Sequence, residues 1–429
     1  MWRTRMTMLL IVSLLLWFPS FSPAQAASGW TDLETSRDVS INKTWVVPLP
    51  QGVTWAQVDG AVVHRGDEFV PVLVQLFEGQ VVISPVKPYE KNSRYTLRIF
   101  LSDGRRLRKE FTTETYPTIQ LGTGTVMQIS ADPKAGFNYD YYLYIPPGLD
   151  RSKKAHLLIE PNNTFVSDDP EFHVRRAKEA VAEWGISRQI ANRINQPLLV
   201  PTFPRPDTPF KGKHVYTHNL SRLALEVGGD LKRIDLQLLA MADDARRLLA
   251  HNGIMSSERL LLNGFSASGS FVIKFPILHP ERVRAIAGGG VNGLPTLPVA
   301  SWEGVNLRYP LGVYDLKELT GKPFNPEAYK KVAQFIYQGD QDTNETLYAR
   351  DIFDPEDTET ILKFLPARYY PDRWEKVRSI YQKLGYPIQT HTYRGFDHRW
   401  APIDDLVAFF EANANDGTGL TPITPSSGQ

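Results

Sequence analysis

The sequence predicts an α/β protein, with a mostly parallel sheet covered by helices on both faces and a small all-β sandwich before it. Up to about residue 115, short alternating strands follow one another and are separated by turns such as Asp103-Gly104. Beyond about residue 125, apolar triplets such as Leu260-Leu261-Leu262 alternate with amphipathic helical segments, which is typical of a parallel sheet. With 429 residues, 42% of them hydrophobic, the chain can bury a sizeable core.

The N-terminal residues 1–26 have the pattern of a secretory signal peptide. Arg3 and Arg5 precede an apolar run at 8–18, and Ala24-Gln25-Ala26 forms a small-x-small cleavage site. The run is shorter than the about 20 apolar residues that span a bilayer, and no later stretch is long enough. We therefore expect a secreted protein, cleaved near Ala26 and without a membrane span. A retained N-terminal anchor is the alternative.

Composition narrows the classes of function. The chain contains no cysteine, which excludes disulfides, thiol nucleophiles and cysteine metal sites. Export without cysteine favours a bacterial source. The net charge of +1 predicts no strong attraction to nucleic acid or to an anionic membrane, so neither is expected as a partner.

Residues 31–115 are expected to form a β-sandwich from several short strands, including a continuous strand at 68–76. The segment 85–97, with its Pro-Val-Lys-Pro-Tyr turn and following strand, resembles bacterial Ig-like domains of secreted and cell-surface proteins. The resemblance implies a spacer or a weak binding unit. We favour the spacer, and contact with a cell surface or a polymer is the alternative.

A linker at 116–125, containing Pro117, Gly122 and Gly124, precedes the larger domain at 126–414. Its expected strands are 139–145, 157–159, 198–200, 260–262, 283–287, 335–337 and 389–393. Its expected helices are 170–194, 231–248 with Asp230 as the cap, 270–278, 371–384 and 403–413. The final segment 415–429 is rich in Gly, Thr, Pro and Ser and is predicted to be disordered.

The turn after the strand 260–262 is the candidate centre of the chemistry. Gly264-Phe265-Ser266-Ala267-Ser268-Gly269 is close to the G-x-S-x-G pattern of a nucleophile elbow, in which a serine stands on a strained strand-to-helix turn. Ser268 replaces the second glycine of that pattern. The alternative is an ordinary Ser/Gly-rich turn before a helix.

A serine hydroxyl becomes nucleophilic when a base takes its proton and an acid orients that base. Asp340 and Asp342 follow the strand 335–337, and His398 follows the strand 389–393. Because parallel strands place their carboxyl ends at one edge of the sheet, both loops are expected beside Ser266. Packed or turn-forming roles are the alternatives for each of these side chains.

On these motifs, the region 138–413 resembles the α/β-hydrolase superfamily, most closely its secreted esterase and polyester-depolymerase-like branch. The resemblance implies Ser266 as nucleophile, His398 as general base and an acid in the loop 339–342. Asp342 fits the family spacing, and Asp340 is the alternative. No cofactor is implied.

The oxyanion hole is expected to take one N–H from Ala267 and a second from Asn163 or Thr164. Many relatives have His-Gly where this chain has Pro161-Asn162. We expect an apolar substrate cleft to be shaped by aromatic and histidine side chains, namely Phe265, Trp400, Tyr216 and His218. The spacing of His214 and His218 would also suit a metal, but no cluster of carboxylates lies nearby, so cleft lining is favoured.

The segment 291–327 carries Trp302, Tyr309 and Tyr314 and is either a lid or pocket wall, or a surface excursion held by its own aromatics. The function predicted from the sequence is a secreted bacterial serine hydrolase that cleaves small-molecule or polymeric carboxylic esters through an acyl-enzyme on Ser266. The alternatives are a serine peptidase with the same triad and a catalytically inactive hydrolase-fold binding protein on the cell surface.

Overall fold

The computed structural model describes residues 29–292, 294 and 296–426, and the chain divides into two compact units between Thr118 and Ile119. That boundary falls inside the segment 116–125 expected to be a linker. The expected signal peptide at 1–26 lies outside the described residues. Across the described ranges, no helix is long and apolar enough to cross a membrane.

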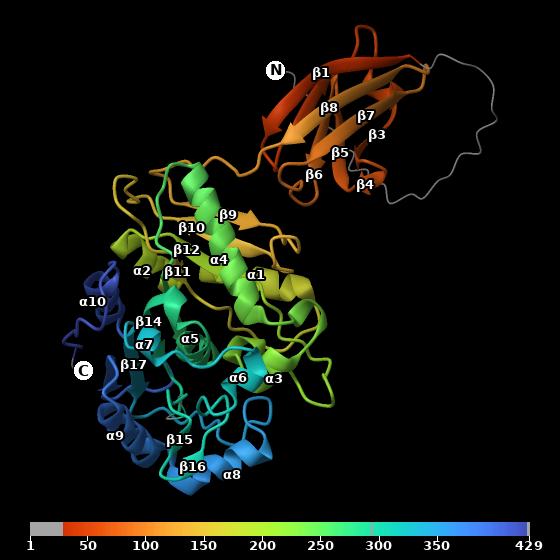
Figure 1. Cartoon of the computed structure of the whole chain (residues 1–429). Helices are drawn as coiled ribbons and strands as arrows, with labels where there is room; N and C mark the ends of the chain where they lie inside the picture. The colour runs from red at the N-terminus through yellow and green to blue at the C-terminus, as the bar shows by residue number, and fades with distance from the viewer. Residues whose placement is uncertain (1–28, 293, 295, 427–429) are drawn as a thin grey trace, which may run out of the picture. The chain divides into compact units, whose positions relative to one another are not determined.

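The N-terminal unit consists of two β-sheets around one core (Figure 1). In sheet order, the strands are β1 (Trp30–Val39), β8 (Arg106–Thr113), β7 (Arg94–Leu101), β3 (Val58–Arg65) and β4 (Glu68–Val70), and in the second sheet β2 (Trp45–Pro48), β6 (Gln80–Pro85) and β5 (Val72–Phe77). The expected all-β unit is therefore present. Its Ig-like character stays a prediction.

One expected strand of this unit is divided. The segment 68–76 breaks at Pro71, so that β4 pairs in the first sheet and β5 in the second. Proline has no N–H for a ladder hydrogen bond, which explains why the chain changes sheets at this residue. The alternation of apolar residues in 68–76 does not predict this change of sheet, because the residues before and after Pro71 keep the same period.

The C-terminal unit is built on an eight-stranded sheet in the order β18-β17-β14-β13-β11-β12-β10-β9. Its strands are β9 (Thr125–Ile129), β10 (Tyr141–Ile145), β11 (Leu158–Ile159), β12 (Leu198–Pro201), β13 (Leu260–Phe265), β14 (Val283–Gly289), β17 (Ala333–Gly339) and β18 (Ile388–Tyr393). Along this order, the strands from β18 to β12 pair in parallel, and β10 pairs antiparallel with both β12 and β9. The expected mostly parallel sheet is confirmed.

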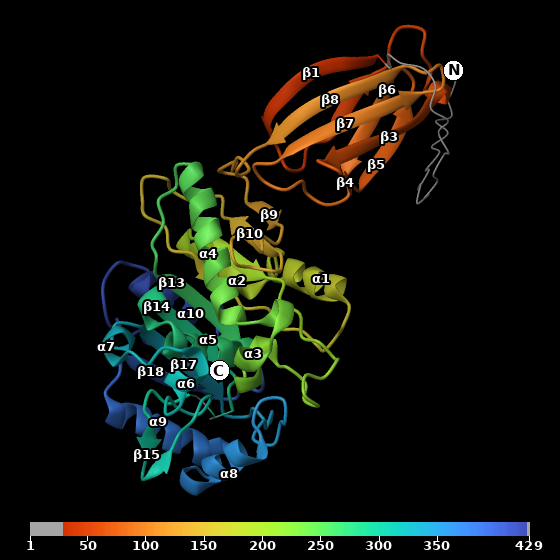
Figure 2. The same ribbon diagram turned by 45° about the vertical axis from the view of Figure 1, so that its right-hand side comes forward.

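Helices lie on both faces of this sheet (Figures 1 and 2). One face carries α1 (Pro170–Ala180), α2 (Ile186–Ile194) and α10 (Ile403–Asn413), and the other carries α4 (Ile234–His251), α5 (Ala267–Leu278) and α9 (Trp374–Leu384). The side chains of β18 show the alternation. The Tyr393 hydroxyl donates to Asp405 of α10, whereas Thr392 accepts from Trp374 of α9.

Shorter elements connect these layers. They are η2 (Thr217–Asn219), α3 (Arg222–Glu226), η3 (Gly229–Leu231), η4 (Pro280–Arg282), β15 (Ser301–Trp302), β16 (Val305–Asn306), α6 (Leu316–Thr320), α7 (Pro326–Tyr329), α8 (Pro355–Phe364) and η5 (Tyr369–Arg373), with η1 (Trp55–Gln57) in the N-terminal unit. Most of them belong to the long connections after β12, β14 and β17.

Several helix boundaries differ from the sequence prediction. The helix expected at 170–194 is two helices, because the chain turns at Gly185, where a Cβ would lie 2.1 Å from the Ala180 carbonyl oxygen. The helix α4 begins at Ile234 with Arg233 as its N-cap, and Asp230 lies in the preceding short turn. Pro371 lies in η5, before the helix that it was expected to open.

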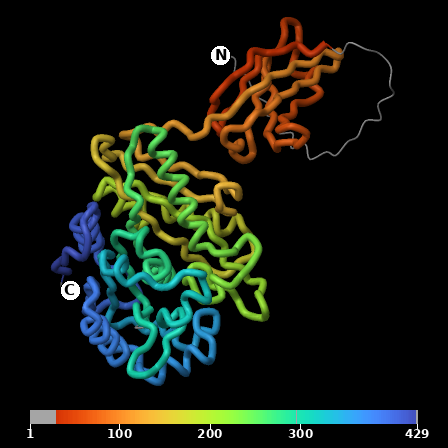
Figure 3. Tube along the Cα trace, in the orientation of Figure 1, coloured from red at the N-terminus to blue at the C-terminus, as the bar shows by residue number. Residues whose placement is uncertain are grey.

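The C-terminal segment was also predicted incorrectly. Residues 415–426 are held against the domain and are not a disordered tail (Figure 3, blue end). Leu420 and Ile423 pack on the core, Gln389 exchanges two hydrogen bonds with Ile423, and the buried Arg284 binds the carbonyls of Asn415 and Gly419. Composition alone misses this order because the partners lie on distant strands.

Candidate active site

Ser266 stands on a sharp turn between β13 and α5. Its backbone has φ 59° and ψ −121°, a region that L-residues with a side chain rarely occupy. The turn is tight because two glycines allow close packing. A Cβ at Gly264 would lie 2.3 Å from the Ser268 carbonyl oxygen, and a Cβ at Gly269 would lie 2.3 Å from the Gly289 oxygen. This is the geometry of a nucleophile elbow.

The same geometry explains why Ser268 can replace the second glycine of the usual pattern. The close approach of helix and strand occurs at Gly269, one position later. Ser268 is buried, and its hydroxyl lies 2.9 Å from the Phe265 carbonyl oxygen and 3.0 Å from the Phe265 N–H. The serine therefore braces the turn from inside, and its presence does not argue against an elbow.

The loops after β17 and β18 bring an aspartate and a histidine together. His398 Nδ1 lies 2.7 Å from Asp342 Oδ2. Asp340, the alternative acid, instead accepts the Gly395 N–H at 2.7 Å and ties the two loops to each other. The geometry therefore selects Asp342 as the partner of the histidine.

Asp342 is almost fully buried, and its environment favours the charged form. Burial by itself raises its pKa, but hydrogen bonds from His398, the Asn344 N–H (2.9 Å) and the Gln338 amide (2.7 Å) outweigh burial and lower the pKa of Asp342 below its ordinary value. Because the ionised carboxylate of Asp342 accepts a hydrogen bond from Nδ1, the neutral imidazole of His398 carries its proton on Nδ1. Its Nε2 is then an acceptor.

His398 Nε2 lies 3.3 Å from the Asn344 side-chain amide. Within the described residues, Ser266 Oγ makes no hydrogen bond to this ring. Ser266 and His398 nonetheless lie at the same site. The ring of Phe265, which precedes Ser266, lies 4.6 Å from the His398 ring, and a Cβ on Gly290 would come into close contact with the rings of both Phe265 and His398. For Nε2 to receive the Ser266 proton, the imidazole must leave Asn344 for the serine, a tightening that catalytic hydrogen bonds commonly show when substrate binds.

Of the residues expected in the oxyanion hole, two remain available and one does not. The Ala267 N–H is at the first turn of α5, where no carbonyl of the helix can accept it. Asn163 is exposed, and its side-chain amide donates to the Phe265 carbonyl at 3.4 Å, which holds its loop beside the elbow. Thr164 was predicted incorrectly, because its N–H donates to His218 Nδ1 at 3.2 Å.

His218 was also expected to contact substrate, and the structure contradicts this. Its ring is 1% exposed, its Nε2–H donates to the Phe203 carbonyl at 2.7 Å, and its Nδ1 accepts from Thr164. Burial lowers the pKa of His218 to about 3, so the ring is neutral. It positions the loop that carries Asn163. In the part of the chain that the structure describes, no group of three or more His, Asp or Glu could hold a metal ion.

The aromatic side chains expected to shape the cleft are separated. Phe265 packs against His398 and Trp400, with ring centroids 4.6 and 5.4 Å apart, and neither Phe265 nor Trp400 lines the cavity beside Ser266. Tyr216 does line that cavity, as expected, and carries the Arg205 guanidinium 3.4 Å above its ring. The segment after β14 contributes a wall through its first residues, while Tyr309, further along, is fully buried with its hydroxyl on the Leu220 carbonyl.

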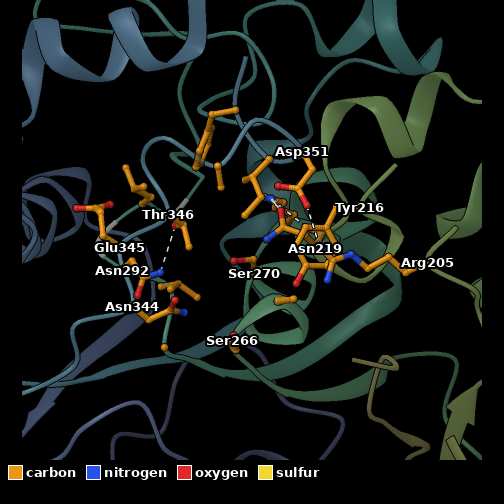
Figure 4. Close-up of a pocket in the computed structure, with 18 residues that line it drawn as sticks. Arg205, Tyr216, Asn219, Ser266, Ser270, Asn292, Asn344, Glu345, Thr346 and Asp351 are labelled. Carbon is orange, nitrogen blue, oxygen red and sulfur yellow. Dashed lines mark hydrogen bonds and ion pairs between the residues drawn. The ribbon is translucent and has the colours of Figure 1, made fainter. Parts of the chain in front are cut away.

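Ser266 opens into a cavity of about 270 Å³ (Figure 4). The lining is formed by Arg205, Tyr216, Asn219, Ser266, Ala267, Ser270, Lys274, Gly290, Val291, Asn292, Leu294, Asn344, Glu345, Thr346, Ala349, Asp351, Ile352 and Phe353. This cavity is far more polar than the apolar cleft expected from the sequence. The close-up places Tyr216, Asn219 and Arg205 on one side of Ser270, and Asn292, Asn344 and Glu345 on the other.

Sequence reasoning missed most of these lining residues, because Arg205, Asn219 and the segment 344–353 have no motif of their own. One signal was readable. Lys274 is a single charged residue within the otherwise apolar stretch Phe271 to Leu278 of a helix, and a lysine at such a position is rarely buried without a role.

Comparison with solved structures returned hydrolases. A thermostable esterase matches at 14% identity and a TM-score of 0.35, with 88% of this chain and 95% of that chain covered. An S-formylglutathione hydrolase from Agrobacterium tumefaciens matches at 13% and 0.34, covering 69% and 95%. A puromycin-hydrolyzing peptidase from Mycobacterium tuberculosis matches at 14% and 0.36, covering 80% and 48%.

No family model matches the sequence, and no curated protein matches it. The solved structures that match include both esterases and peptidases, and their low sequence identity to this chain does not indicate which reaction it catalyses. The assignment of function therefore depends on the residues of this chain.

Proposed function

We propose that the C-terminal unit is a serine hydrolase of the α/β-hydrolase type that cleaves carboxylic esters through an acyl-enzyme on Ser266. The observation that carries the proposal is the strained backbone of Ser266 at a strand-to-helix turn, at the same sheet edge as the Asp342–His398 pair. Strain at a serine that lines a cavity supports a role for its hydroxyl. The chain order serine, aspartate, histidine agrees with this type of enzyme.

In the proposed mechanism, Ser266 Oγ attacks the ester carbonyl while His398 Nε2 takes its proton. The negative oxygen of the tetrahedral intermediate accepts hydrogen bonds from the N–H groups of Ala267 and Asn163. Asp342 stays ionised and stabilises the imidazolium, in agreement with its lowered pKa. His398 then protonates the departing alcohol, and a water molecule, activated by the same ring, releases the acid and regenerates Ser266.

We further propose that the protein is bacterial and secreted, because the N-terminal sequence has a signal-peptide pattern and the chain lacks cysteine. The β-sandwich is proposed to be an Ig-like spacer. The strain at Ser266 and the bracing role of Ser268 favour an active enzyme over an inactive binding protein, since an inactive fold has no use for a strained serine.

The test is labelling with a fluorophosphonate probe, followed by mapping of the modified peptide. The probe reacts with activated serines, so we expect it to modify Ser266 in the wild-type protein and nothing in Ser266→Ala. Ser270→Ala is the matched control, because Ser270 lines the same cavity one helical turn away. Labelling at another serine, or none, would remove the proposed nucleophile.

A panel of short acyl 4-nitrophenyl esters and matched peptide anilides separates ester from amide cleavage. We expect turnover of the esters and little of the anilides. The reverse order would make the chain a serine peptidase with the same triad.

A further inference from the structure

Lys274 is a buried cation in the wall of the cavity. It lies two turns after the nucleophile on α5, so Ser266, Ser270 and Lys274 follow one another on the same helix face, and all three line the cavity. Positions 266 and 274 are separated by about 12 Å along the axis, and helical side chains lean toward the N-terminus, which brings the lysine back toward Ser266. Lys274 is 3% exposed.

The ammonium group of Lys274 has no carboxylate partner among the described residues. Two of its three donors are used by Asn219, through its backbone carbonyl at 2.9 Å and its side-chain oxygen. The buried carboxylate that acts on it electrostatically, Asp357, already pairs with Arg308 at 2.8 Å. One N–H of Lys274 and the side-chain amide nitrogen of Asn219 therefore have no acceptor among the residues that the structure describes.

The other charges around the cavity are balanced in pairs. Arg205 binds Asp351 at 2.8 Å, and Glu345 receives two hydrogen bonds from the fully buried Arg373. Lys274 is thus the one lining charge, in the part of the chain described, that no opposite charge contacts. Burial lowers the pKa of Lys274 to about 7, so an anion arriving beside it would restore its full charge.

We propose that this cavity binds a carboxylate carried by the acyl group of the substrate, so that the enzyme prefers half-esters of dicarboxylic acids. The inference rests on the proposed function, since the ester carbonyl must be at Ser266 for the acyl chain to extend along α5. Lys274 and the Asn219 amide donate to the carboxylate. The other charged residues that line the cavity are already paired with opposite charges, so no second cation competes with Lys274 for the substrate. The chemistry is recognition of a fixed anion at the end of a short chain.

The experiment compares two esters with the same leaving group: the mono-4-nitrophenyl ester of glutaric acid and 4-nitrophenyl valerate, an uncharged ester of similar length. We expect wild-type kcat/KM to favour the half-ester by about 100-fold, the usual scale for a charged hydrogen bond in a buried site. Half-esters of succinic and adipic acid show which chain length reaches Lys274. The ratio of the two esters on one preparation does not depend on how much of the protein is folded.

Two variants test the assignment to Lys274. Lys274→Met should bring the ratio close to one. Asn219→Asp keeps the lysine but supplies its missing counter-charge, so the ratio should fall below one through repulsion of the substrate carboxylate. Lys153→Met, a change of the same charge at an exposed position, is the control and should keep the wild-type ratio.

The outcomes separate the two proposals. A protein that labels at Ser266 and hydrolyses both esters equally keeps the serine hydrolase and loses the carboxylate site. A wild-type preference that survives in Lys274→Met and Asn219→Asp also overturns the inference. A protein that neither labels at Ser266 nor hydrolyses any ester of the series overturns both proposals.

Discussion

Two buried aspartates in the C-terminal unit each hold a histidine, and only one pair lies at the candidate active site. Asp342 and His398 are 2.7 Å apart, and Asp235 and His279 are 2.8 Å apart. The His398 side chain is 29% exposed, whereas that of His279 is 2% exposed, and its Nδ1 has no hydrogen-bond partner in the described part of the chain. The two contacts are nearly the same, but their surroundings differ.

The second difference concerns the carboxylates. Asp235 is bound by the guanidinium of Arg233 through both oxygens, at 2.8 and 2.7 Å. Asp342 is bound by a backbone N–H and a neutral amide in addition to its histidine. The charge of Asp235 is therefore already balanced, while that of Asp342 remains available to stabilise an imidazolium. An Asp–His contact becomes a base only where the second ring nitrogen can reach a substrate.

Exchanging the two histidines for alanine should give the largest contrast. We expect His398→Ala to lower ester turnover by about 10⁴-fold or more with little change in melting temperature, since the lost ring is partly exposed. His279→Ala should keep turnover per folded molecule and lose about 2–3 kcal/mol of unfolding free energy, because a buried hydrogen bond to a charged group disappears. Kinetics and urea unfolding measure the two effects.

Each histidine variant is the control for the other. Turnover of His398→Ala above a tenth of wild type would remove His398 from the mechanism. Loss of activity in folded His279→Ala would mean that the comparison of the two pairs is wrong.

The aspartates should repeat the contrast with a smaller effect. Asp342→Asn leaves a neutral partner that no longer fixes the tautomer of His398, so we expect kcat to fall by about 10³- to 10⁴-fold. Asp235→Asn should leave kcat within about threefold and lower stability by about 2–3 kcal/mol through loss of the Arg233 pair. A kcat that responds equally to both changes would show that the site depends on general packing and not on Asp342.

The dependence of folding stability on acid pH should show the smallest of these effects, and it tests the Asp235 pair. Burial by itself raises the pKa of Asp235, but the bonds from Arg233 and His279 outweigh it and lower the pKa to about 2. A carboxyl with a lowered pKa stabilises the fold above the unfolded value near pH 4, and this contribution is lost as pH falls toward 2. Arg233→Met should raise the pKa of Asp235 and cost about 2–3 kcal/mol at pH 7, because the buried carboxylate loses its guanidinium partner.

Acid unfolding followed by tryptophan fluorescence checks this expectation. The midpoint for Arg233→Met should lie at higher pH than for wild type, and Arg175→Met, at an exposed arginine, is the control. Superimposable acid curves for Arg233→Met and wild type would show that this arginine does not set the pKa of Asp235.

The sequence allowed prediction of the elements that repeat a local pattern. Apolar triplets marked the parallel strands, and the order of Ser266, Asp342 and His398 after three of them placed the candidate site at one sheet edge. Predictions failed where a residue's partner lies far along the chain. His218 was predicted to line the cleft, but it lies in η2 and accepts a hydrogen bond from the Thr164 N–H. The C-terminal segment was predicted to be disordered, but Gln389 and Arg284 bind it.

By itself, the sequence determined the two-part organisation, the mostly parallel sheet and the identity of the proposed nucleophile and base, because strand period and turn chemistry are local. Only the tertiary structure decided which aspartate contacts His398, that Ser268 fits the elbow, and that the cavity beside Ser266 is polar with Lys274 in its wall. These properties depend on distances between segments far apart in the chain. No local pattern encodes such distances.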